Sequence, residues 1–109
     1  MAWLLREGEV LAGLELCETF PARMRGLLGR DSIDGAMLLR PARAVHTFRM
    51  RFPIDVAFVD ADLVVLRTVT MAPNRLGRPV WRARGVLETE AGAFGRWNLQ
   101  PGDQLEVKL

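Results

Sequence analysis

The sequence has one cysteine, Cys17, one histidine, His46, and one lysine among its 109 residues. A single cysteine excludes an internal disulfide, which fits a reducing compartment or an exported fold that relies on its hydrophobic core. One cysteine and one histidine also fall short of the Cys/His sets that usually bind zinc. We therefore expect neither a disulfide scaffold nor a zinc site.

Long apolar runs are also missing. Charged side chains interrupt the first residues, MAWLLREGEVL, so we expect neither a secretory signal nor a membrane span. The expected compartment is the cytoplasm, or the periplasm or exterior if a signal segment has been removed. The phosphate-binding patterns GxxxxGK[ST] and GxGxxG do not occur, and we expect no cofactor.

The length and composition are those of one globular domain, residues 1–109. Half of the residues are hydrophobic and 26% are charged, far from the composition of disordered chains. A chain of this length fits a single hydrophobic core.

The positive charge is concentrated in one region. The net charge is only +2, but residues 40–84 hold nine arginines against three aspartates, and the remainder of the chain is acidic. Arginine stays charged at any physiological pH. This regional surplus modestly favours anionic partners.

Alternating apolar residues and turn formers predict a mainly β fold. We expect a compact antiparallel β sandwich or open barrel of about seven strands with one or two short helices. Helical spacing follows Phe20, and a helical turn is expected over 91–98. Residues 71–84 are expected to form an exposed loop. The expected strands are 10–18, 36–39, 44–48, 54–60, 63–70, 85–90 and 104–108.

Several motifs, in one order over most of the chain, resemble the family of small prokaryotic proteins called domain of unknown function 192. The motifs are MRGLLGR (24–30), GAMLL (35–39), HTFRMRFPIDVAFVD (46–60), Pro73, VLETEAG (86–92) and PGDQLEV (101–107). The resemblance implies a compact, mainly β single domain, often with an export signal, and no assigned activity. It maps the family's recurring polar positions onto His46, Asp55, Glu88 and Asp103. Arg49 stands where glycine is common.

A polar pocket is the candidate site. If residues 44–50 are extended, His46, Phe48 and Met50 share the inward face. Asp55 lies in an apolar strand and needs hydrogen-bond or ion-pair partners. The structural candidates are the turn at Phe52-Pro53 and an arginine, and the functional candidate is His46. In the functional interpretation, Asp55 orients His46 while Glu88 faces the same cleft. In the structural interpretation, these polar side chains only form hydrogen bonds within the fold, because buried polar groups must be hydrogen-bonded.

The loop that follows offers the candidate anion contacts at the rim of this pocket. Arginine beside an aromatic side chain can hold phosphates or stack on bases, but a solvated loop with Trp81 folded onto the core is the simpler interpretation. No nucleic-acid-binding signature is present. The candidate rim residues are Arg75, Arg78, Trp81, Arg82 and Arg84.

Three functions follow from these features. The leading hypothesis is a non-enzymatic domain that binds an unidentified small molecule or protein, with no assigned catalytic residue. A small hydrolase with His46 as general base is the alternative, and binding of an anionic polymer or nucleic acid through the loop is the third. A metal site from Asp55, Asp60, Asp62 or Glu88 is disfavoured because no loop has regular ligand spacing, and Cys17 is expected to fill the core.

Overall fold

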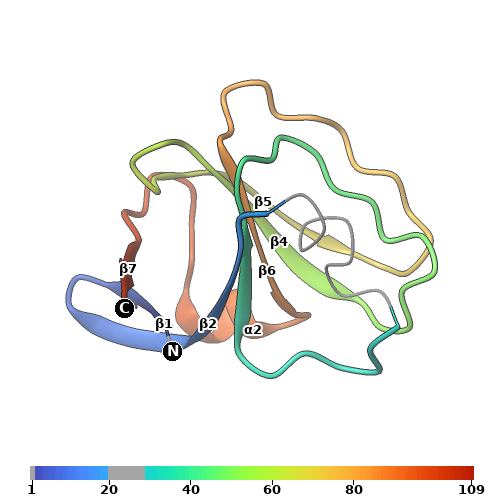
Figure 1. Ribbon diagram of the computed structural model, residues 1–109, viewed down its shortest axis with the longest axis horizontal. Coiled ribbons are helices and arrows are strands. Elements are labelled where there is room, and N and C mark those ends of the chain that lie inside the picture. Colours follow the sequence, from blue (N-terminus) through green and yellow to red (C-terminus); the bar gives the residue numbers. More distant parts are fainter. Residues whose placement is uncertain (1, 20–28) are drawn as a thin grey trace.

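The computed structural model describes residues 2–19 and 29–109. In this part of the chain, seven strands form one open mixed sheet accompanied by one short helix (Figure 1). The predicted mainly β class is confirmed, in the form of a single sheet. The elements are β1 (Ala2–Arg6), β2 (Glu9–Cys17), β3 (Ala36–Leu39), β4 (Ile54–Val59), β5 (Val65–Met71), β6 (Gly85–Glu90), α2 (Ala93–Trp97) and β7 (Glu106–Lys108).

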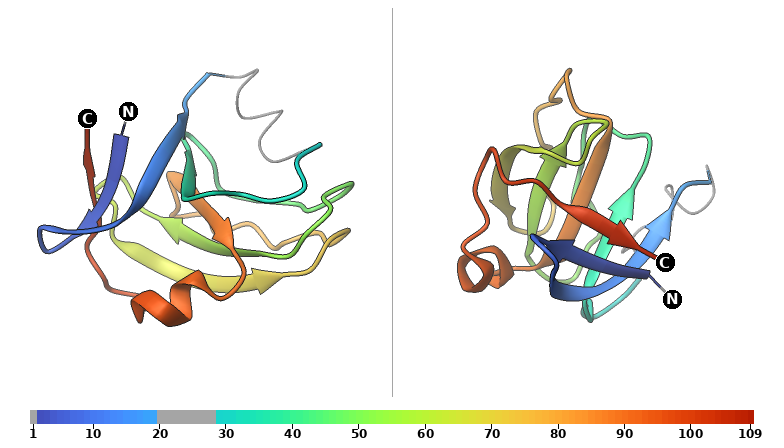
Figure 2. Two further views of the ribbon diagram at one scale, coloured as in Figure 1. Left: turned by 90° about the horizontal axis from the view of Figure 1, so that it is seen from below. Right: turned by 90° about the vertical axis from the view of Figure 1, so that its left-hand side faces the viewer.

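The sheet has the strand order β5-β4-β6-β3-β2-β1-β7. Of the neighbouring strand pairs in the described part of the chain, β2 and β3 run parallel and the others are antiparallel. The sheet curls (Figure 2), and the Val65 N–H donates to the Asp103 carbonyl at 2.9 Å. This contact joins the start of β5 to the segment before β7, so the two ends of the sheet meet at one corner.

The two faces of the sheet bury different hydrophobic clusters. The inner cluster includes Leu4, Val65 and Phe94, which come from both ends of the sheet and from α2. The outer cluster includes Met37, Val56 and Phe58. Because side chains alternate along each strand, neighbouring residues of one strand belong to different clusters.

Two loops run side by side at one end of the molecule (Figure 1). We call residues 40–53 and 72–84 the double loop. Hydrogen bonds join them: the Thr47 N–H donates to the Arg75 carbonyl (2.8 Å), the Gly77 N–H to the Val45 carbonyl (3.0 Å) and the Val80 N–H to the Arg43 carbonyl (2.8 Å). The predicted exposed loop over 71–84 is therefore one half of a paired structure.

The sequence-based prediction missed one strand and placed another wrongly. The apolar segment Ala2–Arg6 forms β1, although its AWLLR pattern has no alternation to reveal it. Residues 44–48 form no strand beyond an isolated bridge between His46 and Leu76. The helix predicted after Phe20 lies outside the described residues.

The other predicted elements agree with the structure. The hairpin of β4 and β5 and the helical turn at α2 are confirmed. No helix within residues 2–19 and 29–109 has the length and apolarity needed to cross a bilayer.

Candidate functional site

His46 lies on the surface of the double loop, so the prediction that its ring points into the core was wrong. The expected alternation breaks at Thr47, which is fully buried, while His46 and Phe48 are exposed. The Thr47 hydroxyl donates to the Ala72 carbonyl at 2.6 Å. The His46 ring instead stacks on the Phe48 ring, with centroids 5.0 Å apart, and its Nδ1 accepts the Phe48 N–H.

Asp55 is a buried structural carboxylate on β4. One oxygen accepts the Thr70 hydroxyl at 2.6 Å. The other accepts the backbone N–H groups of Gly92 (3.0 Å) and Phe94 (3.1 Å). The expectation that a buried Asp55 needs partners is met, but the donors come from β5 and the start of α2 rather than from the Phe52-Pro53 turn or an arginine.

Glu88 lies on the opposite face of the sheet from Asp55. In the pairing of β4 with β6, Asp55 is opposite Thr89 and Val56 is opposite Glu88. Glu88 is therefore one position away from the residue opposite Asp55, and its side chain points to the other face of the sheet. Glu88 is 5% exposed. Burial raises its pKa to about 7 and is the one cause that acts on it, with no donor or cation of the described residues offsetting the burial.

The five predicted pocket residues therefore do not line one pocket. Phe48 accompanies His46 on the surface, Met50 belongs to the outer cluster on the Glu88 side of the sheet, and Asp55 is on the inner side. Asp55 does not orient the imidazole, because its oxygens accept hydrogen bonds from Thr70 and from the start of α2. The hydrolase arrangement of His46, Asp55 and Glu88 is not formed.

The predicted rim residues gather on the double loop. Trp81 is 74% exposed, so it does not fold back onto the core. Arg75, Arg78 and Arg82 are exposed, and the Arg84 guanidinium donates to backbone carbonyls of Trp81 and Ala83. That these side chains contact a ligand stays a prediction.

Two hollows that the sequence did not predict flank β5. The first, of about 400 Å³, lies between β5 and the second half of the double loop, and its lining includes Arg67, Arg75 and Arg78. The second, also about 400 Å³, is lined on the other side of β5 by Asp55, Thr68, Gly92 and Phe94 among others. Arg67 is the one charged residue of β5. It was the feature of the sequence that could have indicated the first hollow.

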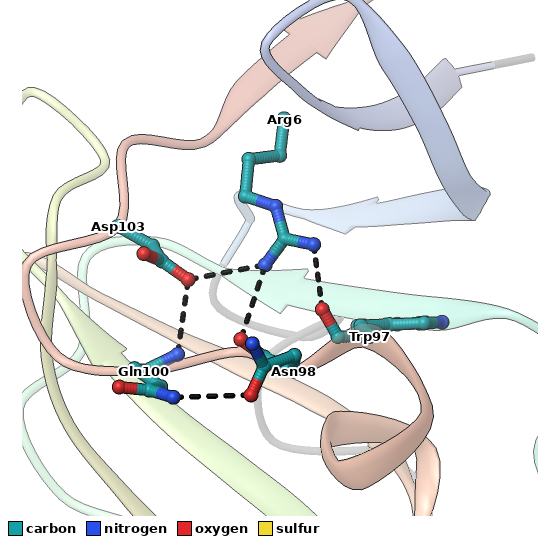
Figure 3. Close-up of polar contacts among 5 residues, drawn as sticks. All are labelled: Arg6, Trp97, Asn98, Gln100 and Asp103. Atoms are coloured by element: carbon teal, nitrogen blue, oxygen red, sulfur yellow. Dashed lines mark hydrogen bonds and ion pairs between the residues drawn. The ribbon is translucent and has the colours of Figure 1, made fainter.

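Asp103 belongs to a structural network (Figure 3). The Arg6 guanidinium donates to Asp103 Oδ2 (3.1 Å) and to the carbonyls of Trp97 (2.5 Å) and Asn98 (3.4 Å). Asp103 Oδ2 also accepts the Gln100 N–H at 3.0 Å. A cation at the carbonyl end of α2 stabilises the free acceptors there, so this network fastens β1 to the C-terminal turn.

Arg49 has a left-handed backbone with φ of 64°, which explains why glycine suits this position. A non-glycine residue pays about 1 kcal/mol or more for this conformation. Arg49→Gly should therefore raise the free energy of unfolding by about 1 kcal/mol, measured by guanidinium denaturation. Arg43→Gly, where φ is not positive, is the matched control and should lower stability. Equal losses in both variants would contradict this explanation.

The sequence disfavours a metal site and predicts that Cys17 fills the core. Within residues 2–19 and 29–109, no three His, Cys, Asp or Glu side chains gather as a metal-binding group. Cys17 is buried, and burial, followed by the negative charges of Glu15 and Glu88, raises the pKa of its thiol. A raised pKa disfavours the nucleophilic thiolate.

The chain is similar in sequence to UPF0127 proteins of archaea. The chain is 30% identical to a UPF0127 protein of Thermococcus gammatolerans over 104 residues, covering 89% of this chain and 68% of that one. It is 28% identical to a UPF0127 protein of Pyrococcus abyssi over 105 residues, covering 92% and 86% of the two chains.

Two crystal structures share the fold. A protein of unknown function from Novosphingobium aromaticivorans superposes with a TM-score of 0.80 at 21% identity, over 96% of this chain and 82% of that chain. A "putative transcription regulator" from Sinorhizobium meliloti superposes with a TM-score of 0.82 at 22% identity, over 97% and 91%. The family model DUF192 (Uncharacterized ACR, COG1430) matches residues 3–107. The chain therefore belongs to the DUF192 family.

Proposed function

We propose that this protein is a non-enzymatic binding domain, and that its double loop contacts an acidic segment of a partner protein. The observation that carries the proposal is the charge of the double loop, which contains eight arginines and His46 but no aspartate or glutamate. The arginines are Arg40, Arg43, Arg49, Arg51, Arg75, Arg78, Arg82 and Arg84.

Most of these arginines have no carboxylate partner among the described residues. Arg40 pairs with Glu18 and Arg51 with Asp31. The other six form no ion pair with a carboxylate in the described part of the chain. Unpaired guanidinium groups are suited to bidentate hydrogen bonds with carboxylates.

Apolar side chains stand exposed among these arginines. Leu76 and Trp81 are each 74% exposed and Phe48 is 45% exposed. Aromatic residues and arginine are enriched at protein interfaces, and they dominate the residues that contribute most to affinity. This combination supports protein binding over a purely solvated loop.

The backbone of the double loop is held in place before any partner binds. Thr47 Oγ1 also accepts the Arg75 N–H at 2.8 Å. A Cβ atom added to Gly77 would lie 2.8 Å from the Val45 carbonyl oxygen, so glycine permits this close approach. A pre-organised surface loses less conformational entropy on binding.

Nucleic-acid binding is the competing function, and one fold neighbour is described as a "putative transcription regulator". The small net charge of +2 is weak for a phosphate backbone, whose binding depends on many neutralised phosphates. We therefore favour a polypeptide, and the test compares both.

A short fluorescent peptide of alternating glutamate and valine provides the test, followed by anisotropy. We expect saturable binding that weakens as salt is added. The double variant Arg78→Gln/Arg82→Gln should weaken binding about tenfold or more, because charge-assisted hydrogen bonds are lost. Lys108→Gln on β7, which removes one positive charge outside the double loop, is the control and should bind as the wild type does.

The alternative outcomes are distinct. Binding of the glutamate peptide and of its lysine counterpart with equal affinity would contradict the proposal. Tighter binding of a single-stranded oligonucleotide, lost in the same double variant, would replace the polypeptide with nucleic acid.

A further inference from the structure

The strand β5 has a free edge. Among residues 2–19 and 29–109, it is the last strand of the sheet and has β4 as its one neighbouring strand (Figure 2). Val65 is tied on its outer side, since its carbonyl accepts the Gly102 N–H at 2.7 Å and its N–H reaches Asp103. From Leu66 to Met71, no described residue forms a backbone hydrogen bond with the outer side of β5.

An exposed edge of this kind is usually protected, because its unpaired N–H and C=O groups recruit other strands. The open part of β5 reads LRTVTM and contains β-branched residues but no proline. Six extended residues span about 20 Å, which is enough to pair with a short peptide.

The two hollows lie on opposite faces of the sheet beside this edge. Arg67 is opposite Phe58 of the outer cluster, whereas Thr68 is opposite Ala57 of the inner cluster. Arg67 lines the first hollow and Thr68 the second, while Val69 and Thr70 border both. A strand added to β5 would direct its successive side chains into the two hollows in turn, because its side chains also alternate.

The two hollows differ in charge. The first contains Arg67, Arg75 and Arg78 and no acidic residue. In the second, the Asp55 carboxylate already accepts three hydrogen bonds, and the other lining residues are small, apolar or hydroxylic. The first hollow therefore suits an acidic side chain and the second a small apolar one.

We propose that an extended segment of a partner protein, with acidic and small apolar side chains in alternation, adds to β5 as an eighth strand. This inference rests on the proposed function and specifies where and in what conformation the acidic segment binds. Main-chain hydrogen bonds supply affinity in such complexes, and pockets for alternate side chains supply specificity.

A second copy of this chain does not suit the β5 edge. Antiparallel pairing of two β5 strands would place the hollows of both copies, each lined by Arg67, Arg75 and Arg78 and by no acidic residue, on the same face of the joined sheet. Like charges directly opposite each other destabilise strand pairs. Charge complementarity therefore selects a different, acidic polypeptide.

The test uses the glutamate–valine peptide and a second version that is N-methylated on alternate residues. N-methylation removes the donors along one edge of the peptide without changing its charge. We expect the unmethylated peptide to slow amide exchange at residues 66–71 of the protein. The methylated peptide, whose donors are removed along the edge that would pair with β5, should bind about tenfold or more weakly. Arg67→Gln should also weaken binding about tenfold, with Lys108→Gln as the control.

The outcomes separate this inference from the proposed function. If both peptides bind equally, depend on Arg78 and Arg82, and leave exchange at β5 unchanged, the double loop binds acidic segments and strand addition is wrong. If neither peptide binds, both proposals fail. If the protein without peptide is a dimer with protected β5 amides, a second copy occupies the edge and the inference is overturned.

Discussion

Glu88→Gln should stabilise the protein by about 3 kcal/mol at pH 8 and have little effect below pH 4.5. The pKa of Glu88 is about 7 in the folded protein, against an ordinary value of 4.5. Below pH 4.5 the carboxyl is protonated in both states, so burial costs no ionisation energy. Between pH 4.5 and 7 the unfolded chain releases this proton and the folded protein retains it, so this group lowers stability as the pH rises. Above about pH 7 the loss is complete and constant.

Guanidinium unfolding of wild type and variant between pH 4 and pH 8 measures this effect. The difference in unfolding free energy should grow across the window from 4.5 to 7. Glu90→Gln is the matched control, because Glu90 lies on the same strand but is exposed and pairs with Arg96. A constant difference between wild type and Glu88→Gln across this pH range would show that the folded carboxyl ionises normally.

Asp55→Ala should have the opposite effect and lower the free energy of unfolding by about 3–5 kcal/mol. The change leaves the N–H groups of Gly92 and Phe94 without their acceptor, and the Thr70 hydroxyl without its partner. Buried donors without acceptors cost more than the net worth of the lost hydrogen bonds.

Chemical denaturation and amide exchange test this prediction together. The amides of Gly92 and Phe94 should exchange faster in Asp55→Ala than in wild type. Thr70→Val removes only one of the three contacts and should cost about 1 kcal/mol. A loss below about 1 kcal/mol in Asp55→Ala, with unchanged exchange at α2, would mean that Asp55 does not anchor this helix.

Local patterns in the sequence were sufficient to predict most strands. Alternation predicted β2, and the turn residues at 60–62 predicted the hairpin of β4 with β5. The strand proposed over 44–48 failed because loop-to-loop contacts, rather than sheet pairing, set the backbone there. Thr47 satisfies its N–H and hydroxyl with the facing loop, a partner that period-two reasoning does not include.

The candidate pocket failed for a different physical reason. The sequence predicts that Asp55 and Glu88 lie in strands, but which face of the sheet each side chain occupies depends on the register between β4 and β6. A shift of one residue places a side chain on the other face. The partners of Asp55 at Gly92 and Phe94 lie 37 and 39 residues away along the chain, beyond any local pattern.

The arginine-rich region was predicted as the rim of a pocket, and the structure gives it a different setting. Hydrogen bonds join residues 40–53 to residues 72–84, so the arginines of two separate segments share one surface with Trp81 and Leu76. Their proximity to the free edge of β5 depends on tertiary structure. Sequence alone provided the charge but not this arrangement.

Chemical-shift mapping with the glutamate–valine peptide tests most directly whether acidic segments bind to the double loop and β5. In a titration of ¹⁵N-labelled protein, we expect the perturbed amide signals to cluster in the double loop and along β5, while the amide signals of β1 and β7 do not shift. Perturbations centred on β1 and β7, or none at all, would contradict this expectation.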